Sequence, residues 1–236
     1  MEEIEIKSFI EYHEYVSRFA ENGEGTRYFF RGVCDAEFQL IPSIGRISIP
    51  FNSYYNELSI FNMFKCQAIQ YIDKIPKNDW EWLALAQHSG LPTRLMDWTS
   101  NPLVALYFAT LPKILYPGET KEKKFAVYFL IKKQGVEYKT SDITNPFENK
   151  VNEIIAIPHY TPKMKNQFGY FSIQEDYSKP FDEFINPNNI KKLVFDASLK
   201  QEMRQTLLGY GINEVSIYPT IEGLAQYLYR LLKTNK

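Results

Sequence analysis

The sequence has few of the residues that would support a structural metal, a disulfide framework or a membrane span. Its 236 residues include two cysteines, Cys34 and Cys66, and three histidines. The cysteines are far apart and lack metal-ligand spacing, so we expect no metal and a reducing, cytoplasmic location. No segment approaches the roughly 20 apolar residues of a membrane helix. The acidic start, MEEIEIKSFIEYHEYV, is unlike a signal peptide, so we expect no membrane partner.

An excess of charge of either sign is also missing. Lysine and arginine number 27 against 28 aspartates and glutamates, the net charge is −1, and neither sign forms a run. A basic surface for nucleic acid is therefore not visible as a cluster in the sequence. The glycine-rich phosphate loops and the Gly-x-Ser-x-Gly turn of hydrolases are absent too. A triad of Ser89 or Ser100 with His88 and Asp97 is disfavoured, because residues adjacent in sequence are rarely triad partners.

Apolar periodicity and an aromatic content of 16% indicate a substantial folded core. The pattern predicts helices over 8–21, 54–72, 79–89, 102–110, 198–211 and 221–232. It predicts strands over 26–33, 93–99, 124–131, 153–158, 168–173 and 191–196, and a short extended piece over 214–220. Ser198 and Gln201 form a predicted capping box. Because strands and helices do not alternate regularly, we expect an α+β fold with a central mixed or antiparallel sheet flanked by helices.

Polar residues gather in one stretch that is otherwise apolar, AQHSGLPTRLMDWTSNPLVALYFA (86–109). If 93–99 is extended, Leu95, Asp97 and Thr99 point one way, and Arg94, Met96 and Trp98 point the other. Ser100 or Asn101 then caps a helix that begins at Pro102. Each polar residue alone has a structural explanation, such as an ion pair or a helix cap. Together they predict a ligand pocket, because burying four polar groups without mutual partners costs several kcal/mol.

Several motifs resemble the FRG-domain family, named after its Phe-Arg-Gly signature. They are Phe30-Arg31-Gly32, LIPSIGR (40–46) and QHSGLPTRLMDWTSNPLVALYFA (87–109), followed by Gln167–Phe171 and EVSIYP (214–219). The resemblance implies a single FRG domain over 1–236, with a helical N-terminal part over about 1–25 and a family core over about 26–230. It also implies an origin in a bacterial or phage genome.

The order of elements further resembles the ADP-ribosyltransferase fold, which implies NAD as substrate. The strand with Arg31 corresponds to the strand whose arginine holds the dinucleotide, and Thr99-Ser100-Asn101 to the triplet before a helix. The resemblance also requires a carboxylate, for which Asp97, Glu153 and the position of Gln167 are the candidates. A glutamine cannot supply the negative charge.

This resemblance assigns roles to residues of the motifs. Arg31 would hold a phosphate, and Gly32 would let the ligand approach closely. Tyr28, Trp98 or Tyr107 would stack on an aromatic ring. The predicted catalytic residues are Arg31, Asp97, Glu153 and Gln167. The predicted ligand-binding residues are Tyr28, Gly32, Gln87, His88, Thr93, Arg94, Trp98, Thr99, Ser100 and Asn101.

Two functions are compatible with this sequence. The first is an NAD-dependent ADP-ribosyltransferase, or an NAD-consuming toxin or effector in bacterial or phage defence. It would have a protein or nucleic-acid acceptor and a cognate antitoxin or regulatory protein. The alternative is a non-catalytic sensor in which Arg31, Arg46 and Arg94 form an anion pocket for a nucleotide-like or nucleic-acid ligand. A structural polar network is the third explanation of the motif. The enzyme hypothesis requires that Arg31 and Thr99 face one cavity.

Overall fold

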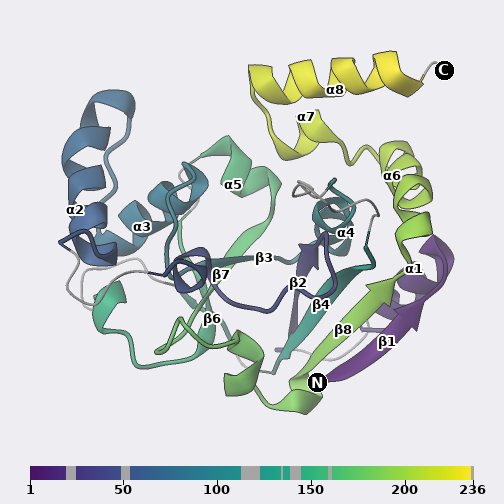
Figure 1. Ribbon diagram of the computed structural model, residues 1–236, viewed down its shortest axis with the longest axis horizontal. Helices are drawn as coiled ribbons and strands as arrows, with labels where there is room; N and C mark the ends of the chain where they lie inside the picture. The colour runs from purple at the N-terminus through teal and green to yellow at the C-terminus, as the bar shows by residue number, and fades with distance from the viewer. Residues whose placement is uncertain are drawn as a thin grey trace.

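The computed structural model describes residues 1–19, 25–48, 54–112, 123–133, 135–138, 145–158 and 161–234. This part of the chain contains one eight-stranded sheet in the order β1-β8-β4-β2-β3-β7-β6-β5 (Figure 1). The strands are β1 (Glu2–Ile6), β2 (Arg27–Val33), β3 (Met96–Thr99), β4 (Phe125–Lys132), β5 (Glu137–Tyr138), β6 (Glu153–Ala156), β7 (Gly169–Ile173) and β8 (Ile190–Phe195). The outermost pairs, β1 with β8 and β5 with β6, are parallel, and the five inner pairs are antiparallel. The predicted α+β fold with a mixed sheet is thus confirmed.

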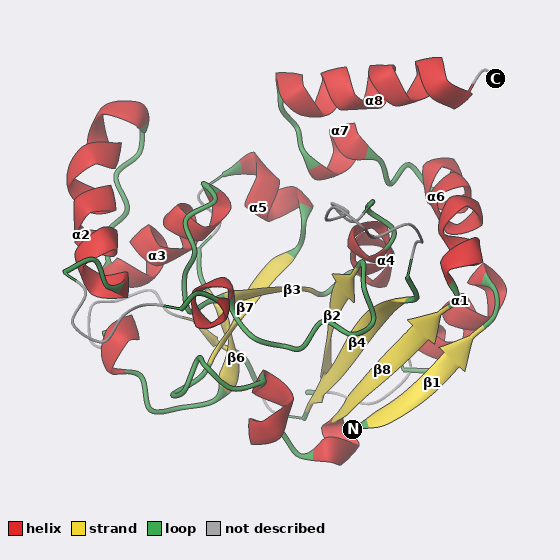
Figure 2. Ribbon diagram, in the orientation of Figure 1, coloured by secondary structure: helices red, strands yellow, loops and turns green. Residues whose placement is uncertain are grey.

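Helices flank this sheet (Figure 2). They are α1 (Phe9–Ser17), α2 (Glu57–Ala68), α3 (Asp79–His88), α4 (Pro102–Ala109), α5 (Pro162–Asn166), α6 (Lys200–Gly209), α7 (Glu214–Ile217) and α8 (Ile221–Thr234). Short 3-10 turns include η1 (Ser43–Arg46), η2 (Ile69–Tyr71), η3 (Pro146–Glu148), η4 (Phe181–Phe184), η5 (Pro187–Asn189) and η6 (Ala197–Leu199). No helix of the described ranges is long and apolar enough to cross a membrane.

Most predicted elements exist, and the cap residues define where several begin. Ser8, Asn78 and Asn101 each accept backbone N–H groups of the first turn of α1, α3 and α4. Two local predictions are wrong. The piece expected to be extended over 214–220 contains helix α7, and α6 starts at Lys200 without a side-chain cap. Asp196 accepts the N–H of Ser198 instead, in the turn before α6.

The N-terminal part begins with a strand rather than with helix. Residues 2–6 pair in parallel with β8 at the edge of the sheet. Glu2 and Glu3 form ion pairs with Lys191 and Lys192 on that neighbouring strand. Part of the predicted turn over 22–25 lies outside the described residues.

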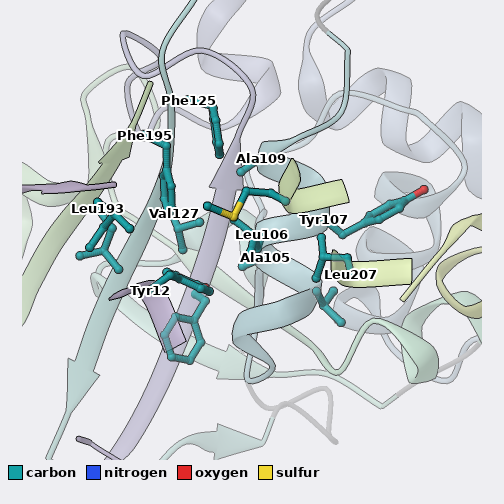
Figure 3. Close-up of a cluster of buried hydrophobic side chains, with 14 of the residues drawn as sticks. Tyr12, Ala105, Leu106, Tyr107, Ala109, Phe125, Val127, Leu193, Phe195 and Leu207 are labelled. Atoms are coloured by element: carbon teal, nitrogen blue, oxygen red, sulfur yellow. The ribbon is translucent and has the colours of Figure 1, made fainter. Parts of the chain in front are cut away.

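Both faces of the sheet are covered. On one face, α1, α4 and α6 pack on β1, β8, β4 and β2 through a cluster that includes Tyr12, Leu106, Phe129 and Phe195 (Figure 3). On the same face, α2 and α3 pack on β3, β6 and β7 through Trp80, Leu83, Phe171 and their neighbours. The opposite face is covered by segments outside the sheet, whose Leu40 and Phe181 belong to one buried cluster with Phe29, Met96 and Trp98.

The sheet has one weakly paired position, and it lies between these two helical groups. Strand β2 pairs with β4 at seven positions, from Arg27 to Val33, but with β3 only at Phe30 and Thr99. Beyond that pair, β2 and β3 are no longer joined by ladder hydrogen bonds. The helices above also separate there, with α3 and α5 on one side and α4 on the other (Figure 1).

Candidate functional site

A cavity of about 610 Å³ lies where β2 and β3 separate, and we call it the central cavity. Strand β2 lines it with Phe30–Val33 and β3 with Asp97–Thr99, while α3, α4 and α5 contribute side chains from above. Its volume falls within the range of small-molecule sites in proteins, about 300–1,000 Å³. Residues from distant parts of the sequence therefore meet at the break in the sheet.

Arg31 and Thr99 both line this cavity, as the enzyme hypothesis requires. Arg31 Nη1 donates a hydrogen bond to the backbone carbonyl of Asp97 at 2.6 Å, which spans the gap between β2 and β3. Burial lowers the pKa of Arg31, the Asp97 carboxylate opposes this shift, and Arg46 adds to it. Two cations thus lie close together with one carboxylate, and a bound anion would relieve their repulsion.

Gln87 positions the Asp97 carboxylate. Its Nε2 donates to Asp97 Oδ2 at 3.1 Å and to the backbone carbonyl of Leu95 at 3.0 Å. Its Oε1 accepts a hydrogen bond from the Thr93 hydroxyl. The backbone N–H of Thr93 donates to the hydroxyl of Ser43, in LIPSIGR, at 3.1 Å. That hydroxyl donates in turn to the backbone carbonyl of Thr93 at 3.3 Å. The two sequence motifs are therefore one hydrogen-bonded network that ends at Asp97.

Aromatic side chains form much of the remaining wall. Phe38, Trp98 and Phe171 border the cavity, and His88 packs edge-on to Phe171 with ring centroids 6.1 Å apart. Burial raises the pKa of Tyr218 above its ordinary value, and the charge of Asp97 adds to the shift. The Tyr218 hydroxyl therefore keeps its proton at neutral pH and can donate a hydrogen bond in the cavity.

Gln167 contributes an amide from the far side, at the end of α5. The residue is buried, with a relative exposure of 9%, and it lines the central cavity. Among the described residues, Gln167 Nε2 has no hydrogen-bond partner. A buried amide donor without a partner is costly, and a ligand acceptor would satisfy it. The predicted positions of Arg31, Asp97, Thr99 and Gln167 are thus brought together.

Arg94 lies away from this cavity, in a buried ion pair. Its Nη2 is 2.6 Å from Glu57 Oε2, its Nε contacts both Glu57 oxygens, and Nη1 donates to the Pro146 carbonyl. The guanidinium also lies 4.8 Å from the ring centroid of Phe147. These contacts fix α2 and the turn before β3, so Arg94 serves the fold, and Arg31 and Arg46 are the arginines of the cavity.

Five other predicted residues also do not line the central cavity, and one of them, Thr93, is connected to it through its hydrogen bond to Gln87. Tyr28, Ser100 and Asn101 line a second cavity, on the other side of the Phe30–Thr99 pair. Glu153 begins β6, opposite Ile173, and its carboxylate is 3.9 Å from Lys132 Nζ. It does not line the central cavity, where Asp97 is the one carboxylate among the described lining residues.

Gly32 is required by the packing of β2 against α4. A Cβ atom at this position would lie 1.8 Å from the backbone oxygen of Ala105 and 2.6 Å from the nitrogen of Ala109. Strand β2 and helix α4 are therefore in direct backbone contact. The glycine of the Phe-Arg-Gly signature allows α4 to lie close enough to form one wall of the cavity.

Lys163 and Tyr218 line the cavity but were not among the site residues that the sequence predicted. Lys163 on α5 adds a third cation, and its Nζ lies 5.2 Å from the ring centroid of Tyr218. No sequence pattern marks Lys163, whereas Tyr218 belongs to the quoted EVSIYP motif. With Arg31, Arg46 and Lys163 against Asp97, the lining carries more positive than negative charge.

A family comparison agrees with the motifs. The model of the FRG domain family matches residues 26–114. This range holds β2, β3 and α2–α4, and so most of the central cavity, whereas Lys163, Gln167 and Tyr218 come from beyond it. No curated protein and no solved structure matches the chain. Residues 26–114 are therefore similar to the FRG domain family, and the arginine of the Phe-Arg-Gly motif lines the central cavity.

Proposed function

We propose that the central cavity binds NAD and that the protein is an NAD-dependent ADP-ribosyltransferase, or an NAD-consuming toxin or effector. One observation carries this proposal above the others. Arg31, Asp97, Thr99 and Gln167 come from three separate segments and line one cavity. A cation, a hydroxyl, a carboxylate and an unpartnered amide are the groups that a dinucleotide substrate needs.

The cationic side chains suit the pyrophosphate. Arg31 and Arg46 line the cavity together, and Lys163 lines it from α5. A guanidinium binds phosphate oxygens with paired donors, and the bond is stronger where water is excluded. The Gln167 amide is a donor for a carbonyl or ribose oxygen. Phe38 and Phe171 offer ring faces or edges for the nicotinamide or the adenine.

The Asp97 carboxylate suits the chemical step. In ribosyl transfer the bond from ribose C1′ to the nicotinamide nitrogen breaks, and nicotinamide leaves with the electron pair. Positive charge then develops on C1′ until the acceptor oxygen or nitrogen bonds to it and loses a proton. A fixed carboxylate beside C1′ stabilises that charge. Gln87 holds Asp97 in place, so the carboxylate need not reorganise during the reaction.

The test compares two carboxylates in purified protein. Asp97→Asn keeps the shape of the side chain and removes the charge in the cavity. Glu153→Gln makes the same chemical change outside it. We expect Asp97→Asn to lower nicotinamide release about 100- to 1,000-fold, the usual effect of one electrostatic group, with NAD affinity changed only a few-fold. Glu153→Gln should leave both unchanged.

Two results would overturn the proposal. One is an absence of NAD binding by calorimetry in folded wild-type protein. The other is equal turnover in Asp97→Asn and wild type. A role as a toxin adds a cellular test, in which expression slows bacterial growth and lowers cellular NAD, and Asp97→Asn relieves both effects.

The sensor alternative rests on Gln167. In the resemblance to ADP-ribosyltransferases, the position of Gln167 is one of three candidates for the required carboxylate, and an amide there cannot supply the charge. A sensor would bind NAD or a related nucleotide with the same dependence on Arg31 and Arg46, and all of the NAD would be recovered intact after long incubation. Calorimetry followed by chromatography of the same sample separates the two functions.

A further inference from the structure

A second cavity, of about 740 Å³, lies behind the Phe30–Thr99 pair, and we call it the aromatic cavity. The two cavities share Phe30 as a lining residue. Neighbouring residues of the motifs are divided between them. Thr99 lines the central cavity and Ser100 the aromatic one, while Gln167 lines the central cavity and Phe168 the aromatic one. The motifs therefore build two sites, and the proposed NAD chemistry uses only the first.

Aromatic rings dominate the lining of this cavity. Phe168 and Tyr210 are 50% and 58% exposed, and Tyr28 and Tyr170 are half-buried. Tyr170 packs edge-on to Phe29, with ring centroids 4.9 Å apart. Tyr28 and Tyr210 stack on Phe129 and Phe9, with ring centroids 5.6 and 5.5 Å apart, so a flat ligand in this cavity meets rings that the surrounding core holds in place.

The charge of the lining favours an anion. No aspartate or glutamate is among the described residues that line the aromatic cavity. Arg27 lines it with an exposed side chain, and His13 lines it from α1. Hydroxyl groups of Ser17, Thr26 and Ser100 supply neutral hydrogen-bonding partners. A ligand with flat rings and a negative charge matches this combination better than an apolar ligand does.

Phe168 occupies an unusual backbone conformation at this place. Its φ angle is 49°, and it is the one residue other than glycine with a positive φ in the part of the chain that the structure describes. The carbonyl of Phe168 accepts the N–H of Ser100 at 3.2 Å, and its own N–H donates to Lys165 at 3.1 Å. Glycine or asparagine adopts this conformation more readily than phenylalanine. The local backbone conformation therefore does not explain why a half-exposed phenylalanine occupies this position, and a role in binding does.

We propose that the aromatic cavity binds a nucleobase together with its 5′-phosphate. The base would stack on the rings of Phe168, Tyr28 or Tyr210, and Arg27 would bind the phosphate. The ligand is either a free mononucleotide or one nucleotide of a single strand, since both present the same chemical groups. Tyr28, Ser100 and Asn101, which the sequence predicts to be ligand-binding, then have their ligand in this cavity.

The probes are a fluorescein-labelled oligoadenylate of about 12 nucleotides, followed by anisotropy, and AMP as competitor. No NAD is added, so the result does not depend on the proposed function. The informative variant is Phe168→Gly, which removes the ring and suits the positive φ. Tyr71→Ala removes an aromatic ring that is 80% exposed and lies outside the cavity, and it is the matched control.

We expect Phe168→Gly to weaken binding of the probe about five- to 150-fold, the range reported for stacking of one base, while its thermal stability stays equal or rises. Tyr71→Ala should bind like wild type. Arg27→Ala should reduce the dependence of log affinity on log salt by about 0.7, as expected for one phosphate contact with a single strand.

Competition by AMP identifies a mononucleotide site, and binding of the oligonucleotide without competition by AMP identifies a strand. Both outcomes support the proposal. It is overturned if neither probe binds at millimolar concentration, or if folded Phe168→Gly binds the oligonucleotide as tightly as wild type.

Discussion

Replacing Gly32 by alanine tests the contact between β2 and α4. The new Cβ atom would lie 1.8 Å from the oxygen of Ala105, whereas carbon and oxygen atoms in contact are normally more than 3 Å apart. The strand or the helix must therefore move by over about 1 Å. Five residues of α4 are fully buried, so a shift of that size loosens the contacts of the whole helix. A gap of 0.5–1 Å already forfeits about a quarter to a half of each dispersion contact.

From these contacts we expect Gly32→Ala to lower the free energy of unfolding by at least about 3 kcal/mol, the upper end of the usual cost of overpacking. Urea unfolding followed by circular dichroism measures this value. Gly209→Ala is the control, because a Cβ there meets no atom within 4 Å and the residue ends helix α6. That variant should be more stable by about 0.5–1 kcal/mol. Equal stability of Gly32→Ala and wild type would refute the packing role and would favour a role of Gly32 in ligand binding instead.

Two further predictions concern buried polar groups. Burial raises the pKa of Tyr12, Tyr107 and Tyr128, so each hydroxyl stabilises the fold fully below the unfolded pKa near 10, and this contribution is lost as the pH rises through the folded value. Urea unfolding above pH 10 should show stability falling by about 1.4 kcal/mol per pH unit for each tyrosine, and a flat profile would contradict this. Arg94→Met leaves the Glu57 carboxylate buried without its partner and should cost about 3–5 kcal/mol, whereas adding Glu57→Leu should recover most of the loss in the same assay.

Local signals in the sequence predicted the elements that build the central cavity. Asn101 followed by Pro102 marked the start of α4, because a side-chain cap and a proline at the first position act within a few residues. The alternation over 93–99 placed Leu95 and Met96 on opposite faces of the sheet, and the structure has them in different core clusters. Period-two patterns are reliable where both faces of a strand are covered.

Partners that are far apart in sequence could not be predicted in the same way. Arg94 pairs with Glu57, 37 residues earlier, and no pattern within the motif indicates that contact. Asp97 and Glu153 are equivalent as carboxylates in the sequence, and only the topology places the first in the cavity. In 214–220, the β-favouring Val215 and Ile217 suggested a strand, but the capping box of Asn213 and Ser216 starts a helix.

The pairing of β1 with β8 has a consequence for how the protein is made. Glu2 and Lys191 are 189 positions apart, so β1 has no pairing partner until β8 has been synthesised. Closing so long a loop is slow compared with forming the local helices. Until β1 docks, β8 presents its backbone at an open edge beside the apolar side chains of Leu193 and Phe195. We therefore expect β1 to pair with β8 late in folding and then to prevent this edge from pairing with another chain.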